Sequence, residues 1–250
     1  MKLNVLVACE ESQSVAREFR ALGHNAYSCD IKECSGGNPE YHIQGDAIEI
    51  AYNSEYQWDL MIAHPPCTYL AVSGARWLYN KDGSKNEERW KNQKDGLAFV
   101  QKLLDAPIDY IALENPVSVI STAIRKPDQI IQPYQFGHEA SKRTCLWLKN
   151  LSPLKPTDIV GKGEFVEWVD KNGRKKRQAK WYMEALSKAK NDEERRTLRS
   201  KTFEGIAKAM ADQWSYEILR DLAMIQTIKE LQALQISEFL DDVAVRKYNL

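Results

Sequence analysis

The sequence predicts an α/β protein in which helices cover both faces of a mostly parallel sheet. Within the first 150 residues, short apolar runs alternate with segments of helical spacing, which is typical of parallel strands joined by crossover helices. The chain has 250 residues, 43% of them hydrophobic and 28% charged, so it can bury one large core. Reactive side chains follow two of the apolar runs, and in such sheets ligands bind at the carboxyl ends of the strands.

The expected elements follow from the spacing of apolar residues and from the turn residues between them. Buried strands are predicted at residues 3–8, 25–29, 60–63 and 110–113. Helices are predicted at residues 12–22 and 94–104, and a short helix is predicted to follow Gly45-Asp46 and to end at about residue 52. Gly23 is expected to close the first of these helices as a C-terminal cap. The polar residues 81–94 are expected to form a mobile loop over the site, with Trp77 and Trp90 as core or loop anchors.

Residues 151–203 differ in composition from the rest of the chain. They contain 14 Lys and Arg against 8 Asp and Glu, although the whole chain has 35 of each. Asp170-Lys171-Asn172-Gly173 lies between two aromatic-containing runs, 164–168 and 178–182, and predicts a β-hairpin. A basic hairpin suits a polyanionic partner, so DNA-binding residues are predicted here. They are Arg174, Lys175, Lys176, Arg177 and Lys180.

From residue 202 onward, apolar residues recur every three or four positions, which predicts a helix that reaches the C-terminus. This helix would either pack on the sheet or extend and pair with a second copy in a homodimer. Three units are therefore expected. They are a catalytic and cofactor-binding core at 1–150, a small basic insertion at 151–203, and C-terminal helices at 204–250 that complete the core.

Several classes of protein are disfavoured by the composition. The N-terminus lacks the pattern of a secretory signal, and no run approaches the roughly 18 apolar residues of a membrane span, so a cytoplasmic protein is expected. The five cysteines are widely spaced, contain no C-x-x-C pair, and predict neither a disulfide framework nor a zinc site. No metal is expected.

Two segments contain residues suited to catalysis. In Pro65-Pro66-Cys67, two prolines of fixed φ leave a thiol little freedom, as a nucleophile requires, although most free cysteines are small core residues. Glu114 follows a nearly apolar strand, so partial desolvation is expected to raise its pKa and let it donate a proton near neutrality. A simple cap or turn role is the alternative for Glu114. Because both residues lie at strand ends, the sequence favours one shared site.

These two segments resemble the motifs of a known family. Pro65-Pro66-Cys67 is similar to the nucleophile motif of the DNA cytosine carbon-5 methyltransferases, in particular the short phage and prophage members, and Glu114-Asn115 is similar to their Glu-Asn motif. The resemblance extends over most of the chain, from residues 3–11 to a last motif at 201–212. It implies a Rossmann-like sheet that binds S-adenosylmethionine, a DNA substrate, and a role in DNA modification in a bacterium or a phage-infected host.

The resemblance also implies a mechanism. The Cys67 thiolate would add to carbon-6 of a flipped cytosine, while Glu114 hydrogen-bonds or protonates ring N3, and carbon-5 would then take the methyl group of S-adenosylmethionine. Ser141-Lys142-Arg143 is similar to the family's basic motif, which makes Arg143 the expected partner of the base or of Glu114. Asn115 would orient the loop that contains Pro66 and Cys67.

For the cofactor, the resemblance implies that Asp30 accepts the ribose hydroxyls and that Asp46 accepts the adenine amino group. The other residues expected at this site adjoin the same motifs and are Ala8, Glu10, Ser12, Ile31, Ala47 and Pro65. The first loop departs from the family because residues 8–14 include no glycine. The methionine end of the cofactor would then be held by Glu10 and residues 12–14 at the start of a helix.

Two other functions remain open on the sequence. An amino-methyltransferase acting on adenine or cytosine also has two prolines after a strand, but it needs Asp, Asn or Ser before them and an aromatic residue after them, where this chain has His64 and Cys67. A catalytically inactive protein of the same fold could bind nucleic acid through its basic stretch alone. Binding of S-adenosylmethionine and covalent trapping on 5-fluorocytosine DNA would separate all three.

Overall fold

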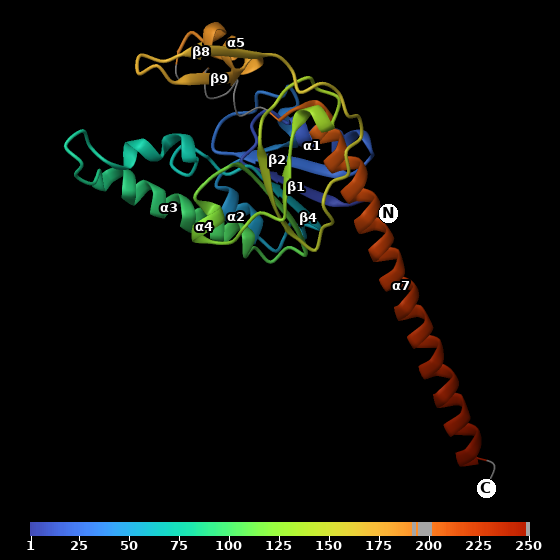
Figure 1. Cartoon of the computed structure of the whole chain (residues 1–250). Coiled ribbons are helices and arrows are strands. Elements are labelled where there is room, and N and C mark those ends of the chain that lie inside the picture. Colours follow the sequence, from blue (N-terminus) through green and yellow to red (C-terminus); the bar gives the residue numbers. More distant parts are fainter. Residues whose placement is uncertain (192–193, 195–201, 249–250) are drawn as a thin grey trace.

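The computed structural model describes residues 1–191, 194 and 202–248. Within these residues, a seven-stranded sheet has the order β3-β2-β1-β4-β5-β7-β6, and a separate sheet pairs β8 with β9 (Figure 1). The strands are β1 (Asn4–Ala8), β2 (Asn25–Asp30), β3 (His42–Gln44), β4 (Leu60–Ala63), β5 (Tyr110–Pro116), β6 (Gln129–Ile131), β7 (Thr144–Lys149), β8 (Phe165–Val169) and β9 (Lys175–Ala179).

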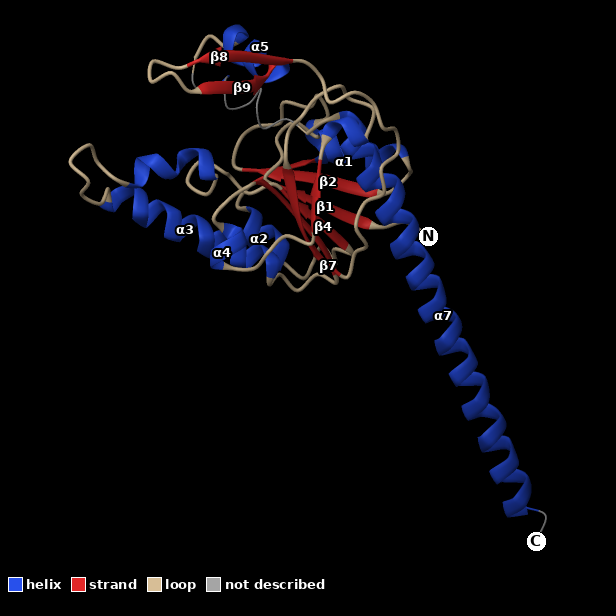
Figure 2. Cartoon of the chain, in the orientation of Figure 1, coloured by secondary structure: helices blue, strands red, loops and turns tan. Residues whose placement is uncertain are grey.

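Helices cover both faces of the large sheet (Figure 2). The helices of this domain are α1 (Ser14–Ala21), α2 (Ala47–Tyr52), α3 (Glu87–Leu104), α4 (Ile120–Ala123) and α7 (Glu204–Tyr248), with short 3-10 turns at Pro39–Tyr41, Val72–Leu78 and Pro133–Gln135. Helix α5 (Lys180–Lys188) lies beside the small sheet of β8 and β9 instead. Helices α1 and α7 pack on one face, and α2, α3 and α4 pack on the other. The predicted α/β class is therefore confirmed.

Alternation along the central strands builds these two cores. Successive side chains of a strand point to opposite faces of the sheet. In β1, Val5 and Val7 join the core under α1 and α7, while Leu6 and Ala8 join the core under α2 and α3. From Val5 to Ala8 both faces of β1 are buried, which is why this part of the strand is apolar.

The strand order is that of a doubly wound, Rossmann-like sheet with one addition. The order 3-2-1-4-5-6 is typical of such sheets, and here β7 is inserted between β5 and β6. Strand β7 pairs antiparallel with both neighbours, whereas the pairs among β3, β2, β1, β4 and β5 are all parallel. The sequence predicted the four central strands but not β3, β6 or β7.

Helix α3 begins earlier than the sequence predicted. Its N-cap is Asn86, whose side chain accepts a hydrogen bond from the backbone amide of Arg89. The polar residues after this cap form exposed helical turns, so the expectation of a loop over all of residues 81–94 is wrong for its second half. Helices of this kind are stabilised by caps and charge patterning more than by an apolar stripe, which explains why periodicity missed the start. Gly23, at φ 86°, closes α1 as expected.

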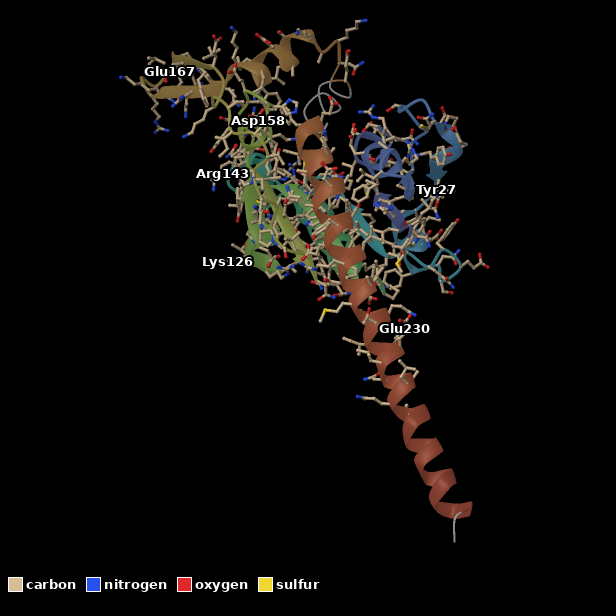
Figure 3. The ribbon with its side chains drawn as sticks, turned by 90° about the vertical axis from the view of Figure 1, so that its right-hand side faces the viewer. Tyr27, Lys126, Arg143, Asp158, Glu167 and Glu230 are labelled. Atoms are coloured by element: carbon tan, nitrogen blue, oxygen red, sulfur yellow. The ribbon has the colours of Figure 1, made fainter. Side chains whose placement is uncertain are left out.

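The C-terminal helix has two parts. Its first turns bury Ile206, Met210, Trp214 and Ile218 against the sheet and α1. Beyond Leu222 the helix extends away from the domain, and Glu230 lies on this extended part (Figures 1 and 3). Apolar side chains there are exposed, and pairing with a second copy remains a prediction. None of the described helices combines the length and the apolar character that crossing a membrane requires.

The basic insertion contains the predicted hairpin, but with a different second strand. Strand β8 pairs antiparallel with β9, and Gly173 adopts a positive φ in the turn between them. The sequence placed the second strand at 178–182, whereas β9 begins at Lys175 and includes three of the predicted basic residues. Trp181 lies in helix α5. Residues 192–193 and 195–201 of the insertion lie outside the described part of the chain. The division into units at 1–150, 151–203 and 204–250 remains a prediction.

Candidate active site

The candidate site lies at the carboxyl-end edge of the large sheet. Strand β1 has β2 on one side and β4 on the other, so the chain winds away from β1 in opposite directions. Such a reversal opens a crevice at the carboxyl ends of the strands, where α/β proteins bind ligands. Asp30 ends β2, Cys67 follows β4, and Glu114 lies near the end of β5. Three residues singled out in the sequence therefore meet at one edge.

The loop that contains Cys67 turns sharply after β4. The backbone amide of His64 still donates to the carbonyl oxygen of Ala8 across the sheet at 2.9 Å, and the two prolines then end the strand. The carbonyl oxygen of Cys67 accepts hydrogen bonds from the backbone amides of Leu70 (3.0 Å) and Ala71 (2.9 Å). Cys67 thus lies at the start of a tight turn with its side chain half-buried, so it is neither in the packed core nor fully exposed.

Asn115 holds this loop in place from the neighbouring strand. Its Nδ2 donates a 2.8 Å hydrogen bond to the carbonyl oxygen of Pro65, and the side chain is buried. A buried polar group needs a partner, and here the partner is a backbone carbonyl that a proline-rich turn leaves without a ladder bond. This is the contact expected from the sequence, and it anchors the chain two residues before the thiol.

Glu114 forms a close pair with His64. The Oε2 atom of Glu114 lies 3.1 Å from Nδ1 of His64, and each side chain is 12% exposed. The sequence placed Glu114 after its strand, but β5 continues through it, and Glu114 lies opposite Leu146 of β7. The extra pairing with β7 holds the backbone of Glu114 in a sheet and leaves its side chain to face His64.

The pKa of Glu114 is lowered, contrary to the prediction. Burial raises the pKa of this carboxyl, but the hydrogen bond from His64 and the positive charge of Lys142 outweigh burial, and the net pKa lies below the ordinary value. Glu114 is therefore an ionised acceptor near neutral pH. The prediction was wrong because it considered the apolar strand before Glu114 and not the cations that face it.

The pKa of His64 is raised. Burial lowers the pKa of the imidazole, but the hydrogen bond and negative charge of Glu114, with a smaller contribution from Glu10, reverse that effect, and Lys142 opposes them only in part. Its other nitrogen, Nε2, is buried and has no hydrogen-bond partner among the described residues. His64 is therefore a proton donor that faces Glu114 on one side and has an unused nitrogen on the other.

His64 and Lys142 are the two site residues that the sequence did not single out. Lys142 belongs to the Ser141-Lys142-Arg143 motif, but the sequence favoured Arg143 as the partner of Glu114. Arg143 is exposed (Figure 3), and its charge partly offsets the rise that burial gives the pKa of Cys145. The charge near Glu114 comes from Lys142 instead. A contact of Arg143 with a bound base remains a prediction.

The pair predicts a specific pH dependence of stability. His64, with its pKa raised on folding, contributes stability that is complete below about pH 6.5 and is lost as the pH rises through its folded pKa. Glu114, with a lowered pKa, contributes stability above about pH 4.3 that is lost as the pH falls through its folded pKa. The His64→Gln substitution is therefore expected to cost on the order of 1 kcal/mol more at about pH 5.5 than at about pH 8.5. Urea unfolding of both proteins at the two pH values measures this difference, and an equal cost at both would contradict it.

The loop after β1 forms its turns without glycine. Cys9 and Gln13 adopt left-handed backbone angles, with φ of 61° and 56°. Such angles cost on the order of 1 kcal/mol for a residue with a side chain, so other contacts must offset the strain. Gln13 is buried, and its side-chain amide forms two hydrogen bonds with the backbone of Asn38. A second loop, residues 31–38, therefore braces the first.

Glu10 occupies the start of helix α1. Its two carboxylate oxygens accept hydrogen bonds from the backbone amides of Val15 (2.7 Å) and Ala16 (3.2 Å), and the side chain is buried. A helix N-terminus attracts an anion, and here the protein's own carboxylate fills that position. The geometry does not fit the expectation that Glu10 holds the methionine end of a cofactor at this helix start, because both oxygens are engaged.

The nucleoside end of a cofactor fits the residues at the ends of β2 and β3. Asp30 and Asp46 both lie near the thiol of Cys9. Burial raises the pKa of this thiol, and the negative charges of the two carboxylates raise the pKa further. Asp30 directs Oδ1 to the amide of Lys32, and Asp46 directs Oδ1 to the amide of Ile48. Each carboxylate uses one oxygen in its own turn, so its second oxygen is the one that a ribose hydroxyl or an amino group would meet.

The remaining predicted cofactor residues differ in their surroundings. Ala8 and Ala47 are buried in the core under α2 and α3, and Ile31 is exposed. The hydroxyl of Ser12 lies 3.0 Å from that of Ser14, and Pro65 is buried while Pro66 is exposed. Contacts of these residues with a cofactor remain predictions.

The predicted DNA-binding residues all lie on the exposed hairpin and at the start of α5. Three of them form ion pairs, namely Lys176 with Asp170 (3.8 Å), Arg177 with Glu167 (3.6 Å) and Lys180 with Glu164 (2.5 Å). The hairpin therefore presents less net positive charge than its lysines and arginines alone suggest.

The insertion is attached close to the site. Trp181 Nε1 donates to the carbonyl oxygen of Ser141 at 3.2 Å, directly beside Lys142, and Ser141 Oγ donates to the carbonyl oxygen of Lys162. Through these contacts the insertion meets the segment that contains the cation acting on Glu114. Among the described residues, no group of three or more His, Cys, Asp or Glu side chains is arranged to bind a metal ion.

The fold and site together define a Rossmann-like α/β protein with a half-buried thiol at the sheet edge. No protein-family model and no curated protein sequence matches the chain. Among solved structures it is similar to an E. coli prophage protein that is described as a candidate DNA modification methyltransferase, with 12% identity and a TM-score of 0.36 over 70% of this chain. The alignment covers 62% of that protein, so the chain spans less than two thirds of its length. Similarity at this level carries no functional conclusion.

Proposed function

We propose that the protein transfers a methyl group from S-adenosylmethionine to carbon-5 of cytosine in DNA, through a covalent bond between Cys67 and the base. The observation that supports this most directly is the way β5 holds both parts of the site. Glu114 faces His64, and its neighbour Asn115 binds the carbonyl of Pro65, so a thiol loop and a carboxylate are tied to adjacent residues of one strand.

The proposed chemistry begins with the thiol. The Sγ atom of Cys67, as a thiolate, forms a bond to carbon-6 of the cytosine, and the electrons of the carbon-5–carbon-6 double bond move toward carbon-5 while N3 takes a proton. S-adenosylmethionine would supply the electrophilic methyl group that carbon-5 receives. A base then takes the proton on carbon-5 and Glu114 takes back the proton on N3, so that the carbon-5–carbon-6 double bond is restored as the bond from Sγ to carbon-6 breaks and the Cys67 thiolate is released. The turn around Cys67 keeps the sulfur in position throughout.

The His64–Glu114 pair would supply the proton. Glu114 by itself is ionised and has none to give, but protonated His64 lies within hydrogen-bonding distance of it. A proton that passes from Nδ1 of His64 to Glu114 would make both residues neutral for as long as Glu114 holds it, which a buried site favours over two charges. When Glu114 then gives the proton to N3, Glu114 returns to its carboxylate form and His64 stays neutral. Lys142 would stabilise the ionised form of Glu114 between reactions.

The cofactor and the DNA would bind on different sides of this centre. Asp30 and Asp46 would hold the nucleoside part of S-adenosylmethionine beyond β1 and β2. The insertion would contact the DNA backbone through Arg174 and Lys175, which lie on the exposed hairpin beside three paired cations. Because carbon-6 is shielded inside a duplex, the target cytosine would be flipped out or presented in a single strand.

Analysis of the methylated product tests the proposal. The full chain is incubated with S-adenosylmethionine and DNA in both duplex and single-stranded form, and the DNA is digested to nucleosides for mass spectrometry. The expected product is 5-methyldeoxycytidine, which is absent when S-adenosylmethionine is left out. Detection of N4-methyldeoxycytidine or N6-methyldeoxyadenosine would contradict methylation at carbon-5 and would show that the protein methylates an amino group instead. DNA that stays unmethylated in both forms would contradict any methyl transfer to DNA.

A further inference from the structure

A pocket lies next to the Cys67 loop, between the segment that follows it and the start of α3. Its volume is about 430 Å³, within the range of small-molecule sites. The lining residues combine aromatic rings, amides and charged groups: Tyr69, Trp77, Tyr79, Asn80, Lys81, Asn86, Glu88, Arg89 and Asn92. No step of the proposed methyl transfer uses this pocket.

The aromatic rings of the pocket are exposed to solvent. The exposed fractions are 38% for Tyr69, 55% for Trp77 and 50% for Tyr79. A core position for Trp77 is therefore wrong, and its role as a loop anchor stays a prediction. Trp90 does anchor the loop, because its Nε1 donates to the carbonyl oxygen of Leu78. Large aromatic surfaces gathered at an opening and left in water are typical of a binding site.

The walls of the pocket are held by specific contacts. Arg89 donates to the carbonyl oxygen of Thr68 at 3.2 Å, and Gln93 donates to that of Tyr69 at 3.0 Å, so α3 fixes the segment after the thiol. The ring of Tyr79 packs edge-on against Trp90. The backbone of the segment and the ring of Tyr79 are thus positioned before any ligand arrives, which lowers the entropy cost of binding.

The chemistry of the lining points to a nucleobase. Arg89 lies over the ring of Tyr69 at 5.2 Å, and Arg76 lies over the ring of Trp77 at 4.5 Å, so each ring has a cation on one face. A base stacked on the opposite face would complete an arginine–aromatic–base arrangement, and the same cations would attract the phosphates beside it. The side-chain amide of Asn92 has a donor and an acceptor for the edge of a base. Asn80 can contribute its acceptor oxygen, because its Nδ2 donates to Ser84 Oγ and to the carbonyl oxygen of Lys85.

From these contacts we infer that the pocket binds an unpaired base of the DNA strand next to the target cytosine. The inference rests on the proposed function, because the pocket begins at Tyr69, two residues after the thiol. The segment of residues 69–92 and the basic hairpin also project toward the same side of the sheet in Figure 1. A strand placed with its cytosine at Cys67 would therefore have an adjoining base within reach of Trp77.

A fluorescent base tests the inference without any methyl transfer. Single-stranded oligonucleotides of about 12 nucleotides, a length that spans a typical single-strand site, carry one central cytosine and 2-aminopurine at successive flanking positions. Stacking quenches 2-aminopurine, so quenching is expected at one flanking position with the full chain. The Trp77→Ala substitution is expected to remove that quenching and to weaken binding at least about tenfold. Trp77→Phe, which keeps a stacking ring, is expected to retain most of both.

The controls separate this inference from the proposed function. Tyr216→Ala removes an aromatic ring that is 70% exposed on α7, and it is expected to bind like the unaltered protein. If Trp77→Ala and Tyr79→Ala both bind and quench normally, the inference is overturned whether or not methylation occurs. If the quenching is present but no methylated base forms, the proposed function fails and the pocket assignment stands. A tenfold preference for RNA of the same sequence would overturn the assignment to DNA.

Discussion

Replacing Cys67 by alanine is expected to lower the rate of methyl transfer to DNA by at least about a thousandfold. Without the sulfur no bond can form to carbon-6, and carbon-5 of an unactivated cytosine is a poor nucleophile. The side chain is only half-buried at the start of a turn that backbone hydrogen bonds and Asn115 hold in place, so the fold is expected to survive the change. Binding of S-adenosylmethionine should persist, because Asp30 and Asp46 are untouched.

Three measurements on matched variants check this expectation. Transfer of a radiolabelled methyl group gives the rate, electrophoresis under denaturing conditions detects a covalent complex with 5-fluorocytosine DNA, and calorimetry measures cofactor binding. Cys34→Ala is the control, because it removes a partly exposed thiol from the loop at residues 31–38. Trapping by the Cys34→Ala variant but not by Cys67→Ala is the expected pattern. Undiminished methylation by Cys67→Ala would refute a covalent role for this residue.

The Glu114→Gln substitution is expected to lower methyl transfer by about a hundredfold or more, the usual range for loss of a proton-transfer group or of a donor that stabilises developing charge. Glutamine keeps the shape and one oxygen, so a hydrogen bond to His64 can remain. It removes the charge that raises the pKa of His64, so His64 is expected to titrate at lower pH in this variant. The predicted loss of rate and the predicted fall of the His64 pKa both follow from removing the carboxylate of Glu114.

Nuclear magnetic resonance of the imidazole protons and steady-state kinetics test both parts. The control is Glu49→Gln, an exposed carboxylate on α2 that is expected to leave the rate and the His64 titration unchanged. A Glu114→Gln variant with full activity would exclude the proposed proton path. A normal His64 pKa in that variant would show that Glu114 does not hold the imidazole in its charged form.

Much of the fold could be predicted from local patterns in the chain. Of the four central strands, β1, β4 and β5 contain continuous apolar runs, because these runs are buried on both faces, and the parallel order follows from the helical segments between the strands. The antiparallel β7 was not predicted from its sequence. Its position between β5 and β6 depends on a return of the chain from the far edge of the sheet, and nothing in residues 144–149 themselves encodes that return.

Within the candidate site, the sequence by itself determined which residues can react and where in the chain they lie. Cys67 between prolines and a turn, and Asn115 beside Glu114, follow from residue types and spacing alone. The tertiary structure decided their electrostatics. His64 faces Glu114 because β4 and β5 pair in register, and Lys142 comes near because β7 runs antiparallel beside β5. A pKa depends on the charges that surround a group in space, so the ionised state of Glu114 could be derived only after these strands were placed together.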